Sequence, residues 1–453
     1  MMKSLFSVLV LFTLLLLACR CKPSGNNVIR DPGDTLVVIQ TIKCREDTAQ
    51  NYCIALPSGF DPARRYPVVF VFDPHGEGYL AVQTFRKGTS DFGFIVAGSN
   101  VIRNGYEKTG YALQVLTGDV TGRYPVDKDR MYAAGFSGGG RVAQEFSQWN
   151  ADIKAIASMG AGYSVGQAER LRNNASMLFI TGNEDFNYHE IRSSFQTLAA
   201  LGIHYFILEY PGPHAWPGPE IIHDALLWFK FDDYRRNPSH IQEKVVHEYL
   251  AKIHRQAELA EERHDILGAV GTYTKGMSFL SGIAKTGSLS RKLTGLQKTE
   301  EYKQSEKQAN EALEMEIRLQ QGYTLALRER DTLWWRNEIR GLNEKISRSD
   351  KDAMLPVYSR IKSFISIAAY SYCNSSLKLN DLQMAERYIA VYRVVDPDNP
   401  DVYYFNALFL AKSGKVNAAA DSFRKAISLG FTDFKKARQE LPEEVYAYGK
   451  TIP

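Results

Sequence analysis

The sequence predicts an α/β domain with a doubly wound, mostly parallel sheet, followed by an all-α domain of helical repeats. Between residues 34 and 235, short β-rich runs alternate with helix-like stretches, as strands and crossover helices do in such a sheet. Beyond Arg235-Arg236-Asn237-Pro238 the strand-like runs disappear, and Ala, Leu, Glu, Lys and Arg dominate. A chain of 453 residues is also too long for one ordinary core, which favours two or more domains.

The N-terminal segment predicts export. Lys3 precedes an apolar run, Leu5 to Leu17, which ends sharply at Ala18-Cys19 and is too short for a comfortable membrane span. A small residue before a cysteine resembles the lipobox of bacterial lipoproteins. The resemblance implies a signal peptide over 1–18, a lipidated Cys19 and an outer-membrane anchor facing the periplasm. The alternative is a plain secretory signal. Residues 19–33 then form a polar tether.

Eight runs predict the strands of the domain at 34–235. The first two suggest an antiparallel hairpin at one edge, and the later ones are near-continuous apolar runs, typical of parallel strands buried on both faces. Helices are expected between them, including 140–149, 189–201 and 219–234. The predicted strands are 35–43, 52–56, 67–72, 94–97, 130–134, 153–159, 177–181 and 205–210.

Two cysteines flank the turn of the predicted hairpin. Cys44 and Cys53 are separated by a polar segment, and an oxidising compartment would permit a bridge across the strands. The sequence leaves open whether they form a disulfide or remain two free thiols. No Cys/His cluster has the spacing of metal ligands, so no metal site is expected.

The segment 240–453 predicts paired helices, with the clearest repeats at 366–433. Ala385, Ile389 and Tyr392 recur 34 residues later as Ala419, Phe423 and Ala426. This period and its small residues resemble tetratricopeptide repeats. The alternative is a generic helical bundle. Because concave repeat surfaces often bind extended chains, a protein or peptide partner is expected there.

The pentapeptide Gly135-Phe136-Ser137-Gly138-Gly139 predicts a serine nucleophile. It follows the apolar run Met131 to Ala134 and precedes a helix-like stretch, which is the strand–turn–helix context of a nucleophile elbow. The pattern alone is weak, because Gly and Ser are common. The flanking glycines provide the room that a strained turn needs, and the serine oxygen would stand at the edge of the sheet.

A serine nucleophile needs a base, and the base needs an orienting acid. Asp185 follows the predicted strand 177–181 and should face the same sheet edge as Ser137, with Glu184 as the alternative acid. His214 lies in a Gly/Pro-rich loop after the strand 205–210, which suits the base.

An acyl-transfer site also needs backbone amides that stabilise the developing oxyanion. Gly138, directly after the nucleophile, is the first expected donor. The second is expected from Gly76 or Glu77, in the turn after the strand 67–72. Ser99-Asn100 and Asn104-Gly105 follow another strand, so they either line the pocket or form a polar turn.

Five segments together resemble the α/β-hydrolase fold, and within it the polyhydroxybutyrate depolymerases and feruloyl-esterase-like enzymes. The resemblance covers about 200 residues and excludes the helical half. His214-Ala215-Trp216-Pro217 is its most specific piece. Two departures are Pro213 before the histidine and Asp73-Pro74 before His75-Gly76. The segments are 52–61, 67–76, 135–141, 182–185 and 214–217.

Together these features predict an exported serine esterase with a Ser137–His214–Asp185 triad, acting on polymer- or glycan-derived esters without a cofactor. A lipid-anchored scaffold with a silent hydrolase fold and a serine peptidase are the alternatives. A net charge of +4, with no basic block, gives nucleic-acid binding little support. Contact with a membrane is expected through the lipid anchor only.

Overall fold

A nine-stranded sheet forms the N-terminal half of the computed structural model, which describes residues 28–29, 37–163, 175–348 and 354–450. The order of the strands is β1-β2-β3-β5-β4-β6-β7-β8-β9. Strands β4 to β9 are parallel, and β1, β2 and β3 add antiparallel pairs at one edge. The strands are β1 (Val28–Ile29), β2 (Val37–Lys43), β3 (Asn51–Leu56), β4 (Tyr66–Phe72), β5 (Ile95–Ser99), β6 (Val126–Phe136), β7 (Ile153–Met159), β8 (Ser176–Gly182) and β9 (Tyr205–Tyr210).

Helices cover both faces of this sheet, because the central strands are apolar on both sides. Buried residues of α1 and α7 join one hydrophobic cluster, and those of α3, α4 and α6 join the cluster on the opposite face. This is the α/β-hydrolase-like architecture that the sequence predicts. The helices are α1 (Gly78–Thr84), α2 (Lys87–Phe92), α3 (Thr109–Arg123), α4 (Gly138–Trp149), α6 (Tyr188–Ala200) and α7 (Pro219–Arg236).

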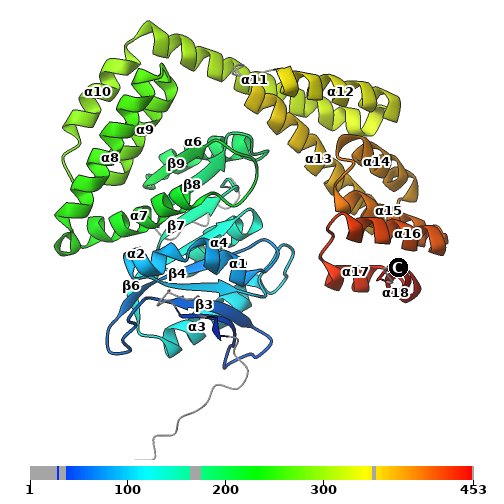
Figure 1. The fold of residues 1–453 in the computed structure, drawn as a ribbon, viewed down its shortest axis with the longest axis horizontal. Coiled ribbons are helices and arrows are strands. Elements are labelled where there is room, and N and C mark those ends of the chain that lie inside the picture. The colour runs from blue at the N-terminus through cyan, green and yellow to red at the C-terminus, as the bar shows by residue number, and fades with distance from the viewer. Residues whose placement is uncertain (1–27, 30–36, 164–174, 349–353, 451–453) are drawn as a thin grey trace, which may run out of the picture.

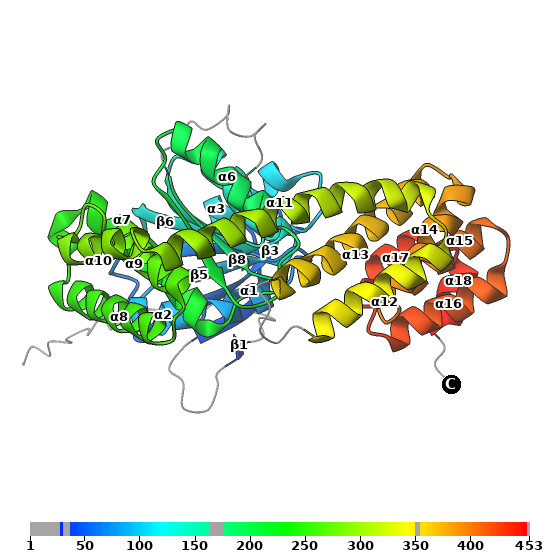
Figure 2. The same ribbon diagram turned by 90° about the horizontal axis from the view of Figure 1, so that it is seen from above.

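The predicted helical half follows α7 and contributes to two different cores. Helix α9 packs on α7, where Trp228 meets Phe279, and α8 and α10 pack on α9, so that all three extend the first core. A second core begins within α11 and continues to α18. Figures 1 and 2 show the long helix α11 running between these two groups. The helices are α8 (Glu243–Glu262), α9 (Ile266–Leu280), α10 (Gly287–Gln297), α11 (Glu300–Glu329), α12 (Thr332–Arg348), α13 (Leu355–Lys378), α14 (Leu382–Val395), α15 (Pro400–Lys412), α16 (Val416–Ser428), α17 (Phe434–Glu440) and α18 (Glu443–Lys450).

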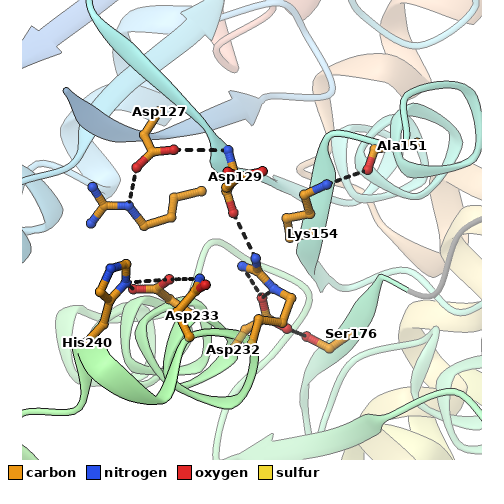
Figure 3. A network of polar contacts seen from close by, with 11 residues as sticks. Asp127, Asp129, Ala151, Lys154, Ser176, Asp232, Asp233 and His240 are labelled. Carbon is orange, nitrogen blue, oxygen red and sulfur yellow. Dashed lines mark hydrogen bonds and ion pairs between the residues drawn. The ribbon is translucent and has the colours of Figure 1, made fainter.

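A polar network fastens the end of α7 to the sheet edge at which the parallel strands begin (Figure 3). Arg236 bonds the Asp232 carboxylate and donates to the backbone oxygen of Asp129, near the start of β6. Ser176, the first residue of β8, donates to Asp232 at 2.8 Å. The chain therefore leaves the sheet domain at the amino ends of the parallel strands. The edge formed by their carboxyl ends remains available for a site.

The two hairpin cysteines are free thiols, so the disulfide interpretation is wrong for this structure. The register pairs Lys43 with Asn51, which places Cys44 and Cys53 out of alignment across the hairpin. Cys44 packs in the cluster on one face of the sheet and Cys53 in the cluster on the other. Because successive side chains of a strand point to opposite faces, this register prevents a bridge.

The predicted signal peptide, the lipidation site Cys19 and most of the tether lie outside the described residues. Within the tether range, Val28 and Ile29 instead form β1, which pairs with β2. In the described part of the chain, no helix has both the length and the apolar character needed to cross a membrane.

Candidate active site

Ser137 lies on a sharp turn between β6 and α4. Its φ of 53° and ψ of −120° are strained for a residue with a side chain, and the serine amide donates to the Met159 carbonyl at 2.7 Å. A Cβ at Gly135 would come within 2.2 Å of the Gly139 carbonyl, and one at Gly139 within 2.0 Å of the Phe72 carbonyl. Only glycine fits these two positions, which explains the motif and holds the serine at the sheet edge.

The three residues predicted as a triad are brought together. His214 Nε2 lies 3.0 Å from Ser137 Oγ, and His214 Nδ1 lies 2.9 Å from both carboxylate oxygens of Asp185. Asp185 is 1% exposed, and its Oδ1 also accepts from the Asn187 amide. No contact joins Glu184 to the histidine among the described residues, so the geometry selects Asp185.

The turn that carries Asp185 is bonded to the loop that carries His214. The Asn183 amide donates to the Tyr210 carbonyl at 2.8 Å, and the Asn183 side chain accepts from the Gly212 amide at 3.1 Å. The Glu184 amide donates back to the Gly212 carbonyl at 2.9 Å. These bonds fix the distance between the acid and the base, and we call residues 182–185 the acid turn.

The turn after β4, where the second oxyanion donor is predicted, is organised by Asp73. The Gly76 amide donates to the Asp73 carbonyl at 3.1 Å, and the Glu77 amide faces Asp73 Oδ1 at 3.4 Å. Asp73 is 2% exposed, so its carboxylate gathers nearby donors, including Trp216 Nε1 at 3.0 Å. Asp73 therefore holds the turn through its carbonyl and its carboxylate, and the assignment of Gly76 or Glu77 as the second oxyanion donor stays a prediction.

Asn104 stands beside the other predicted donor. Gly138 is the first residue of α4, where a backbone amide has no acceptor within its own helix. A Cβ at Gly138 would lie 1.6 Å from Asn104 Oδ1, so the carboxamide rests directly against this glycine. The Asn104 amide in turn donates to the Pro74 carbonyl at 2.8 Å. The sequence signal was only the position of Asn104 after a central strand.

Aromatic and charged side chains frame the three residues. The rings of Phe136 and Phe186 lie 4.6 Å and 4.2 Å from the His214 ring, between centroids. Arg141, one turn into α4, pairs with Glu190 of α6 at 2.8 Å. The two phenyl rings pack against the imidazole, and 16% of the His214 side chain is exposed.

No protein-family model matches the chain, and no curated protein matches it. Among solved structures, S-formylglutathione hydrolase from Staphylococcus aureus is 15% identical, covering 44% of this chain and 99% of that one, with a TM-score of 0.38. The enzyme of the same name from Agrobacterium tumefaciens is 13% identical, covering 45% and 98%, with a TM-score of 0.37. A feruloyl esterase module from Clostridium thermocellum, complexed with sinapinate, is 14% identical, covering 44% and 88%, with a TM-score of 0.34.

Proposed function

We propose that this chain is a serine-dependent carboxylic-ester hydrolase. The observation that carries the proposal is the continuous contact from Ser137 Oγ through the His214 ring to the Asp185 carboxylate. A hydroxyl alone is a weak nucleophile, and an adjacent imidazole accepts its proton as it attacks. The carboxylate behind the ring holds the tautomer whose Nε2 faces the serine, and it stabilises the imidazolium.

In the proposed reaction Ser137 Oγ attacks the ester carbonyl carbon, while its proton moves to His214 Nε2. The carbonyl oxygen becomes an oxyanion that faces the Gly138 amide, the first donor we assign to it, and the amide of Gly76 or Glu77 is the expected second donor. The imidazolium then protonates the leaving alcohol as the ester bond breaks. Water repeats the sequence on the acyl-enzyme, releasing a carboxylic acid and restoring the serine hydroxyl.

A fluorophosphonate probe tests the nucleophile directly, because it bonds covalently to an activated serine. The parent protein should be labelled and Ser137→Ala should not, while Ser90→Ala, which removes an exposed serine on α2, should be labelled like the parent. Labelling of Ser137→Ala at the parental rate would overturn the assignment.

Paired variants of the acid turn test the acid. With p-nitrophenyl esters, Asp185→Asn should lower kcat by up to about 10⁴-fold, because the histidine tautomer is lost. Glu184→Gln should change kcat little, since its carboxylate does not contact the histidine. The reverse ranking would identify Glu184 as the acid.

For the substrate we propose acyl esters derived from polymers or glycans. The resemblance to depolymerases and feruloyl esterases supports this class, as do the aromatic rings of Phe136 and Phe186 beside His214. A panel of p-nitrophenyl and feruloyl esters would rank the acyl groups. Cleavage of peptides, with no turnover of any ester, would favour the peptidase alternative.

We also propose export with a lipid anchor at Cys19, supported by the sequence pattern before it. Incorporation of a labelled fatty acid into the parent, but not into Cys19→Ala, is the expected result. Export of the parent without such labelling would indicate a plain secretory signal.

The helices of 366–433 are proposed to be tetratricopeptide-like and to bind an extended peptide or protein. Support comes from the recurring residues of both repeats, which are all buried: Ala385, Ile389, Tyr392, Ala419, Phe423 and Ala426. Full-length protein can be screened against an array of unstructured peptides, and absence of binding would count against this role.

A further inference from the structure

A buried ion pair lies where the helical half meets the sheet domain. Arg360 of α13 is 5% exposed and Glu316 of α11 is fully buried. Arg360 Nε lies 2.9 Å from both carboxylate oxygens of Glu316, and Nη2 donates to one of them. Burying two charges costs several kcal/mol per ion, and apolar side chains of similar volume often stabilise a core as well or better. The pair therefore suggests a role other than stability.

Arg360 also contacts the sheet domain, at one residue before Asp185 in the chain and at one residue after it. Its Nη1 donates to the Asn183 carbonyl, two residues before the aspartate. Its guanidinium lies 4.3 Å from the centroid of the Tyr188 ring, three residues after it. A planar guanidinium suits this combination, because it can bond a carboxylate and a carbonyl in its plane and stack on a ring with its face.

The contacted residues hold the acid in place. The Tyr188 amide donates to the Asp185 carbonyl at 2.9 Å, and the Asp185 amide donates to the Gly182 carbonyl at 3.1 Å. Asn183 links the same turn to the loop of His214 through its bonds with Tyr210 and Gly212. A shift of the Asn183 carbonyl would thus move the acid turn relative to the histidine.

We propose that Arg360, oriented by Glu316, is a positioning residue that holds the acid turn of the triad from the helical half. The inference rests on the proposed function, and it makes the helical half part of what sets the catalytic geometry. Misplacement of a reacting group by about 1 Å can cost about 100-fold in rate, so one displaced carbonyl is enough to matter.

A second interaction between the helical half and the sheet domain, that of Asp401 with His75, agrees with the placement of Arg360. Burial raises the pKa of Asp401, at the start of α15, while the nearby charges of Lys436 and His75 lower it. His75 belongs to the turn after β4, so α15 lies within electrostatic range of the sheet domain. The contacts of Arg360 place the helical half at the acid turn, and the interaction of Asp401 with His75 agrees with that placement.

The main test removes both charges together. The double variant Glu316→Leu/Arg360→Met leaves no unpaired buried charge, and so should preserve the fold while removing the bond to Asn183. We expect kcat for ester hydrolysis to fall about 10- to 100-fold, with KM unchanged within about twofold. Arg360→Lys keeps a charge for Glu316 but loses the fork geometry, so an intermediate loss is expected. It also provides a variant if the double substitution does not fold.

The matched control is Arg387→Met, which removes an arginine that also bonds a backbone carbonyl, that of Arg330, but within the helical half. It should leave kcat unchanged. Hydrogen exchange of the peptide 182–190 gives a readout independent of activity, and it should accelerate in the double variant only.

The outcomes separate the two proposals. Parental kcat and exchange in a folded double variant would overturn the role of Arg360. Accelerated exchange, in a protein whose parent neither hydrolyses esters nor binds the fluorophosphonate, would leave the contact standing and refute the esterase. An equal loss of kcat in Arg387→Met would show a general effect of the helical half, and would also overturn the specific role.

Discussion

The nucleophile elbow and the second core are both tightly packed, but by different atoms. Around Ser137, backbone atoms fill the space that a side chain would need. A side chain at Gly135 would meet the backbone of Gly139, and one at Gly139 would meet the backbone of Phe72. In the second core, side chains pack on side chains, as Tyr404 does on Phe431 with 4.6 Å between centroids. Backbone cannot move without displacing a strand, whereas side chains can adopt other rotamers. The elbow should therefore be less tolerant of change than the helical core.

The largest effect is expected for Gly139→Ala. The new methyl group would lie 2.0 Å from the Phe72 carbonyl oxygen, and relief requires movement of β4. We expect destabilisation of about 4 kcal/mol or more, and loss of fluorophosphonate labelling. Gly118→Ala, at an exposed position in α3 with nothing within 4 Å, should be neutral or stabilise by up to about 1 kcal/mol. Equal thermal melts for both variants would refute the contrast.

Phe423→Ala should have a large but more local effect. Phe423 is fully buried in the second core, and truncation of such a ring costs about 3–5 kcal/mol. Hydrogen exchange during denaturant unfolding should show α16 opening at lower denaturant than β7. Leu379→Ala, at a position 78% exposed, should change stability by no more than about 0.5 kcal/mol. Simultaneous opening of α16 and β7 would show that the two cores unfold as one unit.

The same contrast explains what could be predicted from sequence. Ser137, Asp185 and His214 each follow a strand, so local pattern and chain order were sufficient to propose them. Most of the strands were readable for the same reason, since they are short apolar runs, whereas β6 begins before the predicted 130–134, in a charged stretch. The two-residue strand β1 was missed because Val28 and Ile29 stand alone in a polar segment.

Features that depend on distant pairing could not be read in this way. Asp73, in the turn expected to supply an oxyanion donor, accepts a hydrogen bond from Trp216, 143 residues further along the chain. Arg360 bonds Asn183 across 177 residues. No local pattern joins either residue to its distant partner. The pairing register of the two strands next to Cys44 and Cys53 was also ambiguous in the sequence, because a shift of one residue moves a side chain to the other face of the sheet.

His204 should make the free energy of unfolding depend on pH. This effect should be smaller than those of Gly139→Ala and Phe423→Ala. Burial, with the charge of Arg235, lowers the pKa of His204 to about 4. Its ring stacks on Trp228 at 4.8 Å, and its Nε2 has no partner among the described residues. The unfolded histidine titrates near 6.5, so between pH 6.5 and 4 the unfolded state binds more protons. Stability should therefore fall as the pH falls through this window, by about 2 kcal/mol or less after allowance for partial exposure.

Denaturant midpoints measured from pH 7 to pH 4 would check this slope. His204→Gln should flatten it, and His247→Gln, which replaces an exposed histidine on α8, should retain it. An unchanged slope in His204→Gln would assign the acid sensitivity to other groups.

Cys44 and Cys53 should add nothing to stability through a disulfide. Their reactivity should differ clearly between the native and the unfolded protein. Burial raises the pKa of Cys44 and of Cys53 to about 12, so at pH 8 only about one thiol in 10⁴ is a thiolate. Iodoacetamide should leave both residues unmodified in the native protein and modify both after unfolding without a reductant, as peptide mapping would show. A reductant should not change the melting temperature. A linked peptide pair containing Cys44 and Cys53, with a mass lower by two hydrogens, would contradict the register that places the two thiols on opposite faces of the sheet.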